Sequence, residues 1–421
     1  MVFEDFAGAH QTVLWAVFAV ALIMGAVVNK TNFCTMGAVS DLVNIGDSGR
    51  MRAWLLAMAV AILGVVLLEG MGLVGLDSTR PGYRGESLPW IEYLLGGILF
   101  GIGMTLASGC GNKCLVRIGG GNLKSVMVLG IIAVIAYFMV NPFPGTDATL
   151  YSLLFYPWTN PAAISLSTSQ DLGSMTAGMF NGDVATMRIV LGLVVGLGLL
   201  AFVFKSGAFR SSFDNVLGGL VVGLAVLGAW YITYGLVTIS SFGDSTSWAG
   251  YVSQWDFLSD GSSTKPASVG TQSFTFINPM GETLGYAASG FASELVTFGV
   301  VALAGVIAGS FLWALLSRGF RWEWFSSWRD FGNHAFGAVL MALGGVLAMG
   351  CTIGQAVTGA STLALGSFIA FGGIVLGSAL TMKVQYYKMV YEEEATFGKA
   401  VLTSLVDMRL LPGKLRKLEA I

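Results

Sequence analysis

The sequence predicts an all-α protein that crosses a membrane about nine times, and three observations lead to this prediction. Of its 421 residues, 55% are hydrophobic and only 11% are charged, whereas soluble globular domains carry about 25% charged residues. Apolar runs of membrane-spanning length recur along the chain, and Lys and Arg gather in alternate connections between them. The net charge of −2 provides no basic face, so the composition favours membrane lipid as the surroundings and excludes a nucleic-acid partner.

The apolar runs predict the individual spans. They lie at residues 12–28, 53–70, 93–108, 126–140, 188–204, 214–230, 291–316, 334–349 and 363–382. Several are short for a hydrocarbon core of ~30 Å at a rise of ~1.5 Å per residue. Irregular backbone is tolerated at that depth only where protein or a water-filled cavity covers it. The short runs therefore predict buried re-entrant loops.

Positive charges predict the orientation of the spans. They occupy alternate connections and the tail: Arg50 and Arg52; Lys113, Arg117 and Lys124; Lys205 and Arg210; Arg318, Arg321 and Arg329; Lys399, Arg409, Lys414, Arg416 and Lys417. The long connections 141–187 and 241–290 are mainly acidic, and the connection 71–92 is ambiguous. The positive-inside rule then places the N-terminus outside and the C-terminus in the cytoplasm, in the inner membrane of a bacterium or archaeon. Glu4 and Asp5 stand where a signal peptide would carry Lys or Arg, so we expect the first span to be retained.

Two pairs of segments predict an internal repeat. Residues 96–110 align with 337–351, because both are Gly-rich and end in Gly-Cys, and residues 33–37 align with 231–235. By the count of spans the two copies point in opposite directions, which is typical of transporters with a site between broken helices. The predicted parts are a first half (1–140) with the Cys34 and Cys110 loops, an outer loop and linking span (141–213), a second half (214–382) with the Cys351 loop and the outer loop 241–290, and a cytoplasmic tail (383–421).

The cysteines are the main candidates for chemistry. Cys34, Cys110 and Cys351 fall at predicted helix breaks beside glycine or other small residues, where the backbone can leave helical dihedrals and approach a ligand closely. A lone cysteine in a membrane helix otherwise packs as a small apolar side chain. Cys114 lies one helical turn after Cys110, at the position of Gln355 in the second copy, and both interpretations stay open for it.

Other uses of these thiols fit the sequence less well. A zinc site needs four close Cys or His ligands, but His10 and His334 are far from any cysteine in the sequence. The 18 Met residues are scattered, which does not favour copper, so we expect no metal and no other cofactor. Cys110 and Cys114 lack the Cys-x-x-Cys spacing of redox enzymes. A membrane redox enzyme or sulfurtransferase that forms a cysteine persulfide stays open as an alternative to transport.

Two lysines lie close to the same breaks. Lys30 precedes Cys34 by one turn, and Lys113 follows Cys110 closely. Either ammonium group can lower the electrostatic barrier to an anion. Both lysines also fit ordinary positive-inside topology, which explains them equally well.

Three motifs together give a resemblance to a known family. They are Phe33-Cys34-Thr35-Met36-Gly37-Ala38-Val39-Ser40-Asp41, Ser108-Gly109-Cys110-Gly111 and Gly350-Cys351-Thr352-Ile353-Gly354. In this order they resemble the YeeE/YedE family of membrane proteins, whose characterised members take up thiosulfate. The resemblance implies an hourglass-shaped helical protein in which Cys34, Cys110 and Cys351 are transient contacts of the anion. It also implies a possible TusA-like sulfur-carrier partner on the cytoplasmic side, or a selenium compound as an alternative cargo. Departures from the simpler members are Lys30 where Arg is common, the extra Cys114 and the long outer loops.

These observations predict a transporter or channel rather than an enzyme. A thiol in apolar surroundings stays neutral and does not repel an anion, and its S–H group is a weak donor. Weak donors spaced along a pore can replace hydration in steps without trapping the ion. The sequence does not decide between thiosulfate, sulfite, hydrosulfide and a selenium analogue.

Overall fold

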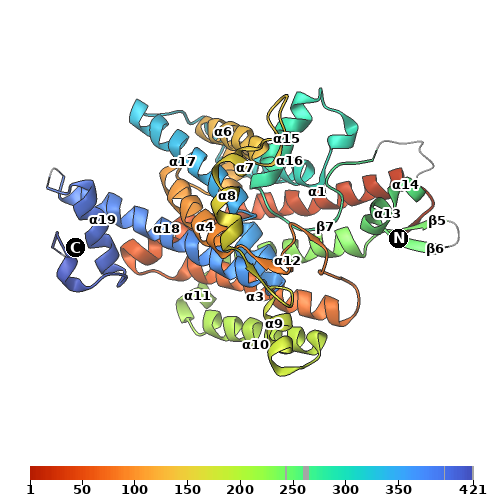
Figure 1. Ribbon diagram of the computed structural model, residues 1–421. Coiled ribbons are helices and arrows are strands. Elements are labelled where there is room, and N and C mark those ends of the chain that lie inside the picture. Colours follow the sequence, from red (N-terminus) through yellow and green to blue (C-terminus); the bar gives the residue numbers. More distant parts are fainter. Residues whose placement is uncertain (242–243, 259–264, 393, 420–421) are drawn as a thin grey trace.

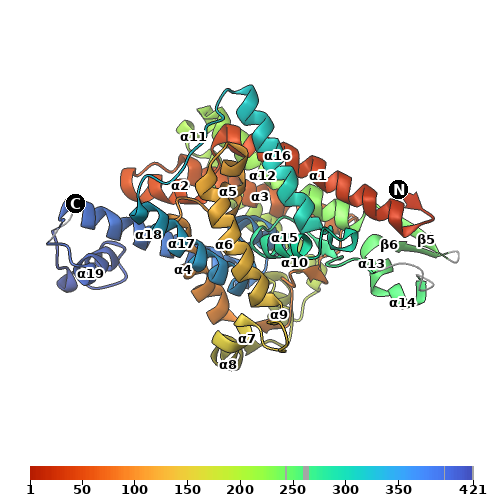
Figure 2. The same cartoon turned by 90° about the horizontal axis from the view of Figure 1, so that it is seen from above.

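Helices dominate the computed structural model, and the two ends of the chain lie at opposite ends of the molecule (Figure 1). The structure describes residues 1–241, 244–258, 265–392 and 394–419. Part of the predicted outer loop 241–290 therefore lies outside the described residues. We call the two ends the N-terminal end and the C-terminal end. Figure 2 shows β5 and β6 at the first and α19 at the second.

Within the described residues, eight helical stretches are long and apolar enough to cross a membrane, so the chain is a polytopic α-helical membrane protein. They are α1 (Phe6–Thr31) followed by α2 (Thr35–Ser40) and the π-helical turn η1 (Asp41–Ile45), α3 (Gly49–Gly70), α4 (Trp90–Leu106) followed by α5 (Gly111–Gly119), α6 (Leu123–Val140), α10 (Val184–Phe204), α12 (Phe213–Tyr234), α16 (Phe298–Leu316) and α18 (Leu365–Val390). The helix α17 (Trp328–Leu347) is as long but carries Arg329, Asp330 and His334 in its first turns. It occupies the place of the predicted span 334–349, and the exact number of crossings stays a prediction.

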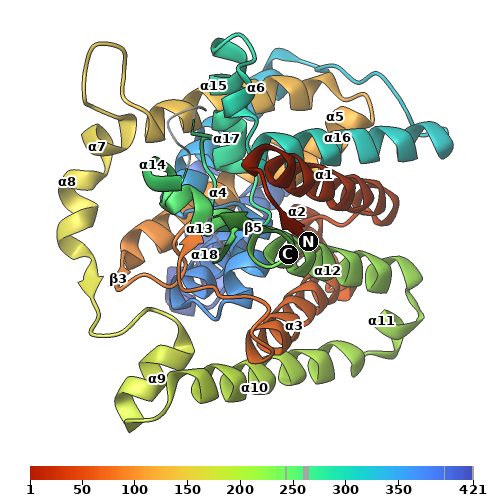
Figure 3. The same cartoon turned by 90° about the vertical axis from the view of Figure 1, so that its right-hand side faces the viewer.

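Shorter elements cap the bundle. The helices are α7 (Leu150–Leu154), α8 (Tyr156–Thr159), α9 (Leu172–Phe180), α11 (Gly207–Ser211), α13 (Trp248–Ser253), α14 (Trp255–Leu258), α15 (Ile277–Ala288), α19 (Phe397–Asp407) and the turns η2 (Asn160–Ala162), η3 (Ser293–Leu295), η4 (Gly354–Gly359) and η5 (Gly413–Leu415). The strand β5 (Thr238–Ser241) lies between β1 (Val2–Phe3) and β6 (Asp244–Ser247) in one sheet. The other strands pair as β2 (Thr79–Arg80) with β7 (Thr271–Gln272), and β3 (Ser87–Leu88) with β4 (Ile164–Ser165). Seen from the N-terminal end, α7 to α10 follow the periphery while α18 lies near the centre (Figure 3).

Three predicted boundaries differ from the observed ones. The span predicted at 291–316 begins only at Phe298, because the side chain of Thr297 caps the helix by accepting from the Val300 amide. The helix α18 runs past residue 382 to Val390, since its last turns pack against α19. The break predicted at 231–235 comes at Gly235, after the whole of α12.

Glycines bring α4 and α17 into close backbone contact. A Cβ atom on Gly96 would lie 2.7 Å from the carbonyl oxygen of Gly344, and one on Gly103 would lie 2.5 Å from that of Gly337. Small residues permit such approach in membrane helices. In the aligned copies Gly96 corresponds to Gly337, and Gly103 corresponds to Gly344. Gly96 therefore contacts the counterpart of Gly103, and Gly103 contacts the counterpart of Gly96. A twofold relation between the halves would produce this reciprocal contact.

The pairs α1–α16 and α3–α12 also join a helix of one predicted half to a helix of the other. Gly25 of α1 packs on the backbone of Val306 in α16, while Gly223 of α12 packs on the backbone of Ala57 in α3. The start of α1 adjoins the end of α12 through the β1–β5 pairing, so these two helices run in opposite directions. Both observations favour the predicted inverted repeat.

Candidate functional site

Three helix breaks of the same geometry place the predicted cysteines. Each long helix ends, a residue adopts the left-handed backbone conformation, and the cysteine follows two positions later. Cys34 and Cys110 are extended. The left-handed residues are Asn32 (φ 51°) before Cys34, Ser108 (φ 59°) before Cys110 and Met349 (φ 55°) before Cys351. Left-handed conformations are uncommon outside glycine. The same conformation also ends a helix away from the cysteines, at Asn181, so at these three places it marks a helix end two residues before a cysteine.

The three thiols converge in the interior. Cys34 is 5% exposed, Cys110 is 2% exposed and Cys351 is fully buried, and all three are free. Cys110 lies within electrostatic range of both Cys34 and Cys351. The structure therefore brings together residues from both predicted halves, separated by up to 317 positions of sequence (351 − 34). In this conformation the thiols are closed to both ends of the molecule.

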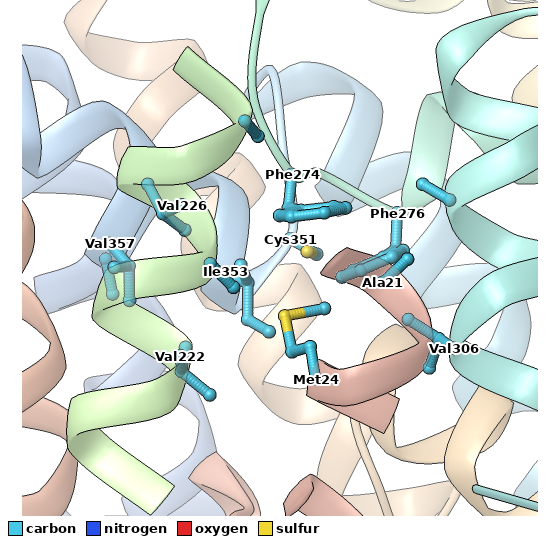
Figure 4. Packing of buried hydrophobic residues seen from close by; sticks show 14 of the residues in the cluster. Ala21, Met24, Val222, Val226, Phe274, Phe276, Val306, Cys351, Ile353 and Val357 are labelled. Atoms are coloured by element: carbon cyan, nitrogen blue, oxygen red, sulfur yellow. The ribbon is translucent and has the colours of Figure 1, made fainter. Parts of the chain in front are cut away.

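Apolar side chains surround the thiol of Cys351. Figure 4 shows Phe274 and Phe276 beside it, with Met24 and Ile353 nearby. The Gly354 amide donates to the Cys351 sulfur at 3.5 Å, which holds the turn after the break. On this side a passing ion would meet an apolar constriction.

Phe274 and Phe276 belong to a re-entrant segment that we placed, incorrectly, in the outward-facing loop 241–290. Residues 273–277 are all buried. The Ser273 hydroxyl donates to the Val226 carbonyl at 2.8 Å, and the Thr358 hydroxyl donates to the Phe274 carbonyl at 2.7 Å. These bonds satisfy part of the backbone of a non-helical segment in the core. The apolar run in Phe-Thr-Phe-Ile was the available signal.

The two predicted lysines have different surroundings. The Lys113 ammonium donates to the side-chain oxygen of Asn32 at the first break and lies within electrostatic range of Cys34 and Cys110. The Lys30 ammonium instead pairs with Asp214 at 2.7 Å at the start of α12. The structure therefore brings Lys113 to the cysteines, whereas the ion pair of Lys30 is made with α12.

Cys114 is 1% exposed and packs in the main hydrophobic core. Its sulfur lies 3.9 Å from the carbonyl oxygen of Gly109, which precedes α5 at the Cys110 break. This contact fits the interpretation of Cys114 as a small buried side chain. A role in binding stays a prediction.

Two cavities lie toward the two ends of the molecule. One, of about 350 Å³, opens near the C-terminal end and reaches Ser108 at the Cys110 break. Its other lining residues are Met36, Ser40, Asn44, Thr105, Met382, Gln385, Tyr386 and Met389. The second, of about 320 Å³, lies near the end of α3 and the start of α10, toward the N-terminal end. Cavities on both sides of a closed layer are what an hourglass shape implies.

The cavity toward the N-terminal end contains a network of paired charges. The Arg84 side chain is 1% exposed and donates to both carboxylate oxygens of Glu69, at 2.6 and 2.8 Å. Arg188 pairs with Asp77 at 2.8 Å and with Asp171 at 2.9 Å. Burial alone would raise the pKa of the Asp171 carboxyl, but hydrogen bonds from Arg188 and two serines lower it to about 2. No local sequence pattern predicted this network, because it joins the end of α3 and the connection after it to Asp171 and to the start of α10.

Comparisons with known proteins found a family model and relatives that match most of this chain. The family model described as "Sulphur transport" matches residues 30–380. The thiosulfate transporter TsuA of Escherichia coli is 22% identical over 365 residues, which cover 84% of this chain and 90% of that protein. The thiosulfate transporter TsuA of Spirochaeta thermophila is 23% identical over 374 residues, covering 87% of this chain and 97% of that protein.

Proposed function

The chain belongs to the sulphur transport family, and from that premise we propose that it carries thiosulfate across the membrane along the thiols of Cys34, Cys110 and Cys351. That it is a multi-pass membrane transporter of sulfur compounds follows from the family and the apolar helices. Thiosulfate is the named cargo of both relatives. The observation that carries the thiol pathway is the convergence of three free, buried cysteines at three helix breaks of the same geometry.

The chemistry of the thiols suits a dianion with a soft terminal sulfur. A neutral S–H group donates weakly, so each contact replaces some hydration without holding the ion. Lys113, beside Cys34 and Cys110, offsets the cost of bringing negative charge into a low-dielectric interior. The α5 helix begins directly after Cys110, and its free amide groups add to this attraction.

Passage requires the closed layer to open. The constriction of Phe274 and Phe276 separates Cys351 from solvent, and both rings are fully buried. Apolar constrictions gate many channels by excluding water. We infer that thiosulfate moves down its own gradient, maintained by consumption of sulfur inside the cell, whenever this segment shifts.

The predicted orientation gives each end of the molecule a role. With the N-terminus outside, the paired-charge cavity receives the anion, and the cavity that reaches Ser108 releases it. A TusA-like carrier protein would then accept sulfur at the C-terminal end, near α19. Cysteine accessibility to a membrane-impermeant thiol reagent, at single cysteines introduced next to β6 and on α19, tests the orientation directly.

The thiol pathway is tested by uptake of radiolabelled thiosulfate into proteoliposomes. Cys110→Ala and Cys351→Ala are expected to remove nearly all uptake, because each deletes one step between the cavities. Cys114→Ala is the matched control, since this thiol is equally buried but does not follow a helix break as the other three cysteines do. Full uptake by the first two variants would overturn the pathway.

A further inference from the structure

Two threonine hydroxyls are buried beside the cysteines, where the thiol sulfurs are weak hydrogen-bond partners. The Oγ1 atoms of Thr275 and Thr352 have no hydrogen-bond partner of ordinary geometry among the described residues. Thr352 is fully buried and Thr275 is 9% exposed. Buried polar groups in proteins are nearly always paired, and an orphaned one calls for an explanation.

Both hydroxyls lie at the thiols. Thr352 follows Cys351 in the chain, but its side chain lies beside the sulfur of Cys110. Thr275 lies beside Cys351 and against the turn that follows it, where a Cβ atom on Gly354 would lie 2.5 Å from the Thr275 oxygen. The glycine therefore leaves the room that this hydroxyl occupies.

The two predicted halves place different side chains beside their thiols. In the first half, Cys34 directly precedes α2 and lies near Cys110. In the second half, the re-entrant segment places Thr275 just before α15 and beside Cys351. Thr275 thus lies beside Cys351 much as Cys34 lies beside Cys110, so the site contains a thiol–thiol pair and a hydroxyl–thiol pair.

Packing alone does not account for these hydroxyls. Valine has the same shape as threonine and would fill both positions without an unpaired polar atom. Thr35, which follows Cys34, is a third buried hydroxyl without a partner in the described part of the chain. In contrast, Thr31 donates to the Val27 carbonyl at 2.8 Å and Thr358 donates to the Phe274 carbonyl. Unused donors at the thiols are what a site for an oxygen-bearing ligand requires.

We propose that the hydroxyls of Thr275 and Thr352 bind the oxygen atoms of the passing anion, so that the site selects sulfur oxyanions over hydrosulfide. The proposal rests on the transport function above and specifies the class of its substrate. The hydroxyl is a better donor to oxygen than a thiol is, which leaves the sulfurs to contact the soft end of the anion. Hydrosulfide has no oxygen and gains little from either threonine.

The test compares Thr275→Val and Thr352→Val with Thr275→Ser and Thr352→Ser in proteoliposomes. A lost hydrogen bond to a charged ligand is expected to raise the KM for thiosulfate about tenfold or more in each valine variant. The serine variants are expected to stay close to wild type. Sulfite is expected to compete less well with thiosulfate in the valine variants, while the weak competition by sodium hydrosulfide stays unchanged. Thr31→Val is the matched control, because its hydroxyl bonds within α1.

Thermal stability separates binding from folding. Removal of an unpaired buried hydroxyl is expected to leave Tm unchanged or raise it, so lost transport with retained Tm supports the proposal. Valine variants with wild-type KM, or serine variants as impaired as valine ones, would overturn it while leaving the transport function in place. If wild-type protein takes up no thiosulfate, the proposed function fails and this inference falls with it.

Discussion

Positive charge is arranged differently in two regions of the molecule. In the cavity toward the N-terminal end, Arg84 and Arg188 each bind carboxylates in fixed geometry. At the Cys34 and Cys110 breaks, the Lys113 ammonium donates to the neutral side chain of Asn32. Within the described residues no carboxylate lies in ion-pair distance of Lys113. Paired charges hold connections together, whereas an uncompensated charge remains available to an anion.

The largest loss of stability is expected when the ion pair between Arg84 and Glu69 is broken. Arg84→Met removes the cation and leaves Glu69, which is 19% exposed, without its partner. Breaking such a buried pair costs about 3–5 kcal/mol, so the free energy of unfolding in detergent is expected to fall by that amount. Asp77→Asn is the control, because Asp77 is 74% exposed and an exposed pair contributes about 0–1 kcal/mol. Equal effects of the two variants would show that the network has no structural role.

The second effect is a pH dependence in the same region. The pKa of Asp171 is about 2, below its ordinary value of 3.8. A lowered pKa contributes stability that is present above about pH 4 and is lost as the pH falls through about 2. The shift corresponds to about 2 kcal/mol. Thermal unfolding between these pH values is expected to depend on pH more weakly in Asp171→Asn than in wild type, and an unchanged dependence would contradict this assignment.

The breaks could be predicted from the sequence, whereas the network and the re-entrant segment could not. Gly-Cys endings are local signals, so the sequence predicts the breaks before Cys110 and Cys351, and α4 and α17 end there in the structure. Arg84 and Glu69 lie 15 residues apart, but they share their cavity with Arg188. No local sequence pattern predicts a partner about 100 residues further along the chain. The burial of Phe274 in the core was not predicted, because a long polar connection separates this residue from α12.

The third prediction concerns thiosulfate uptake and Lys113, the lysine at the Cys34 and Cys110 breaks. Lys113→Met is expected to reduce thiosulfate uptake about tenfold, because the lost attraction to a dianion is worth at least one charged hydrogen bond. Lys113→Arg is expected to retain most uptake, since it keeps the charge. Stability is expected to change little, because Asn32 is exposed and regains a partner from water. Uptake at the wild-type level in Lys113→Met would remove the distinction between the two regions.

The smallest effect is expected at Lys30, the candidate whose charge is already paired. Its ammonium contacts Asp214 at 2.7 Å and lies 5.1 Å from the centre of the Phe213 ring, and the Lys30 and Asp214 side chains are 30% and 55% exposed. Exposed ion pairs contribute about 0–1 kcal/mol, so Lys30→Met is expected to lower stability by no more than this. Because Asp214 neutralises the charge, uptake is expected to stay within about twofold of wild type.

Asp214→Asn frees the Lys30 ammonium and provides the sharper test. If uptake rises in Asp214→Asn but not in the double variant with Lys30→Met, a released Lys30 attracts the anion as Lys113 does, and pairing alone separates the two lysines.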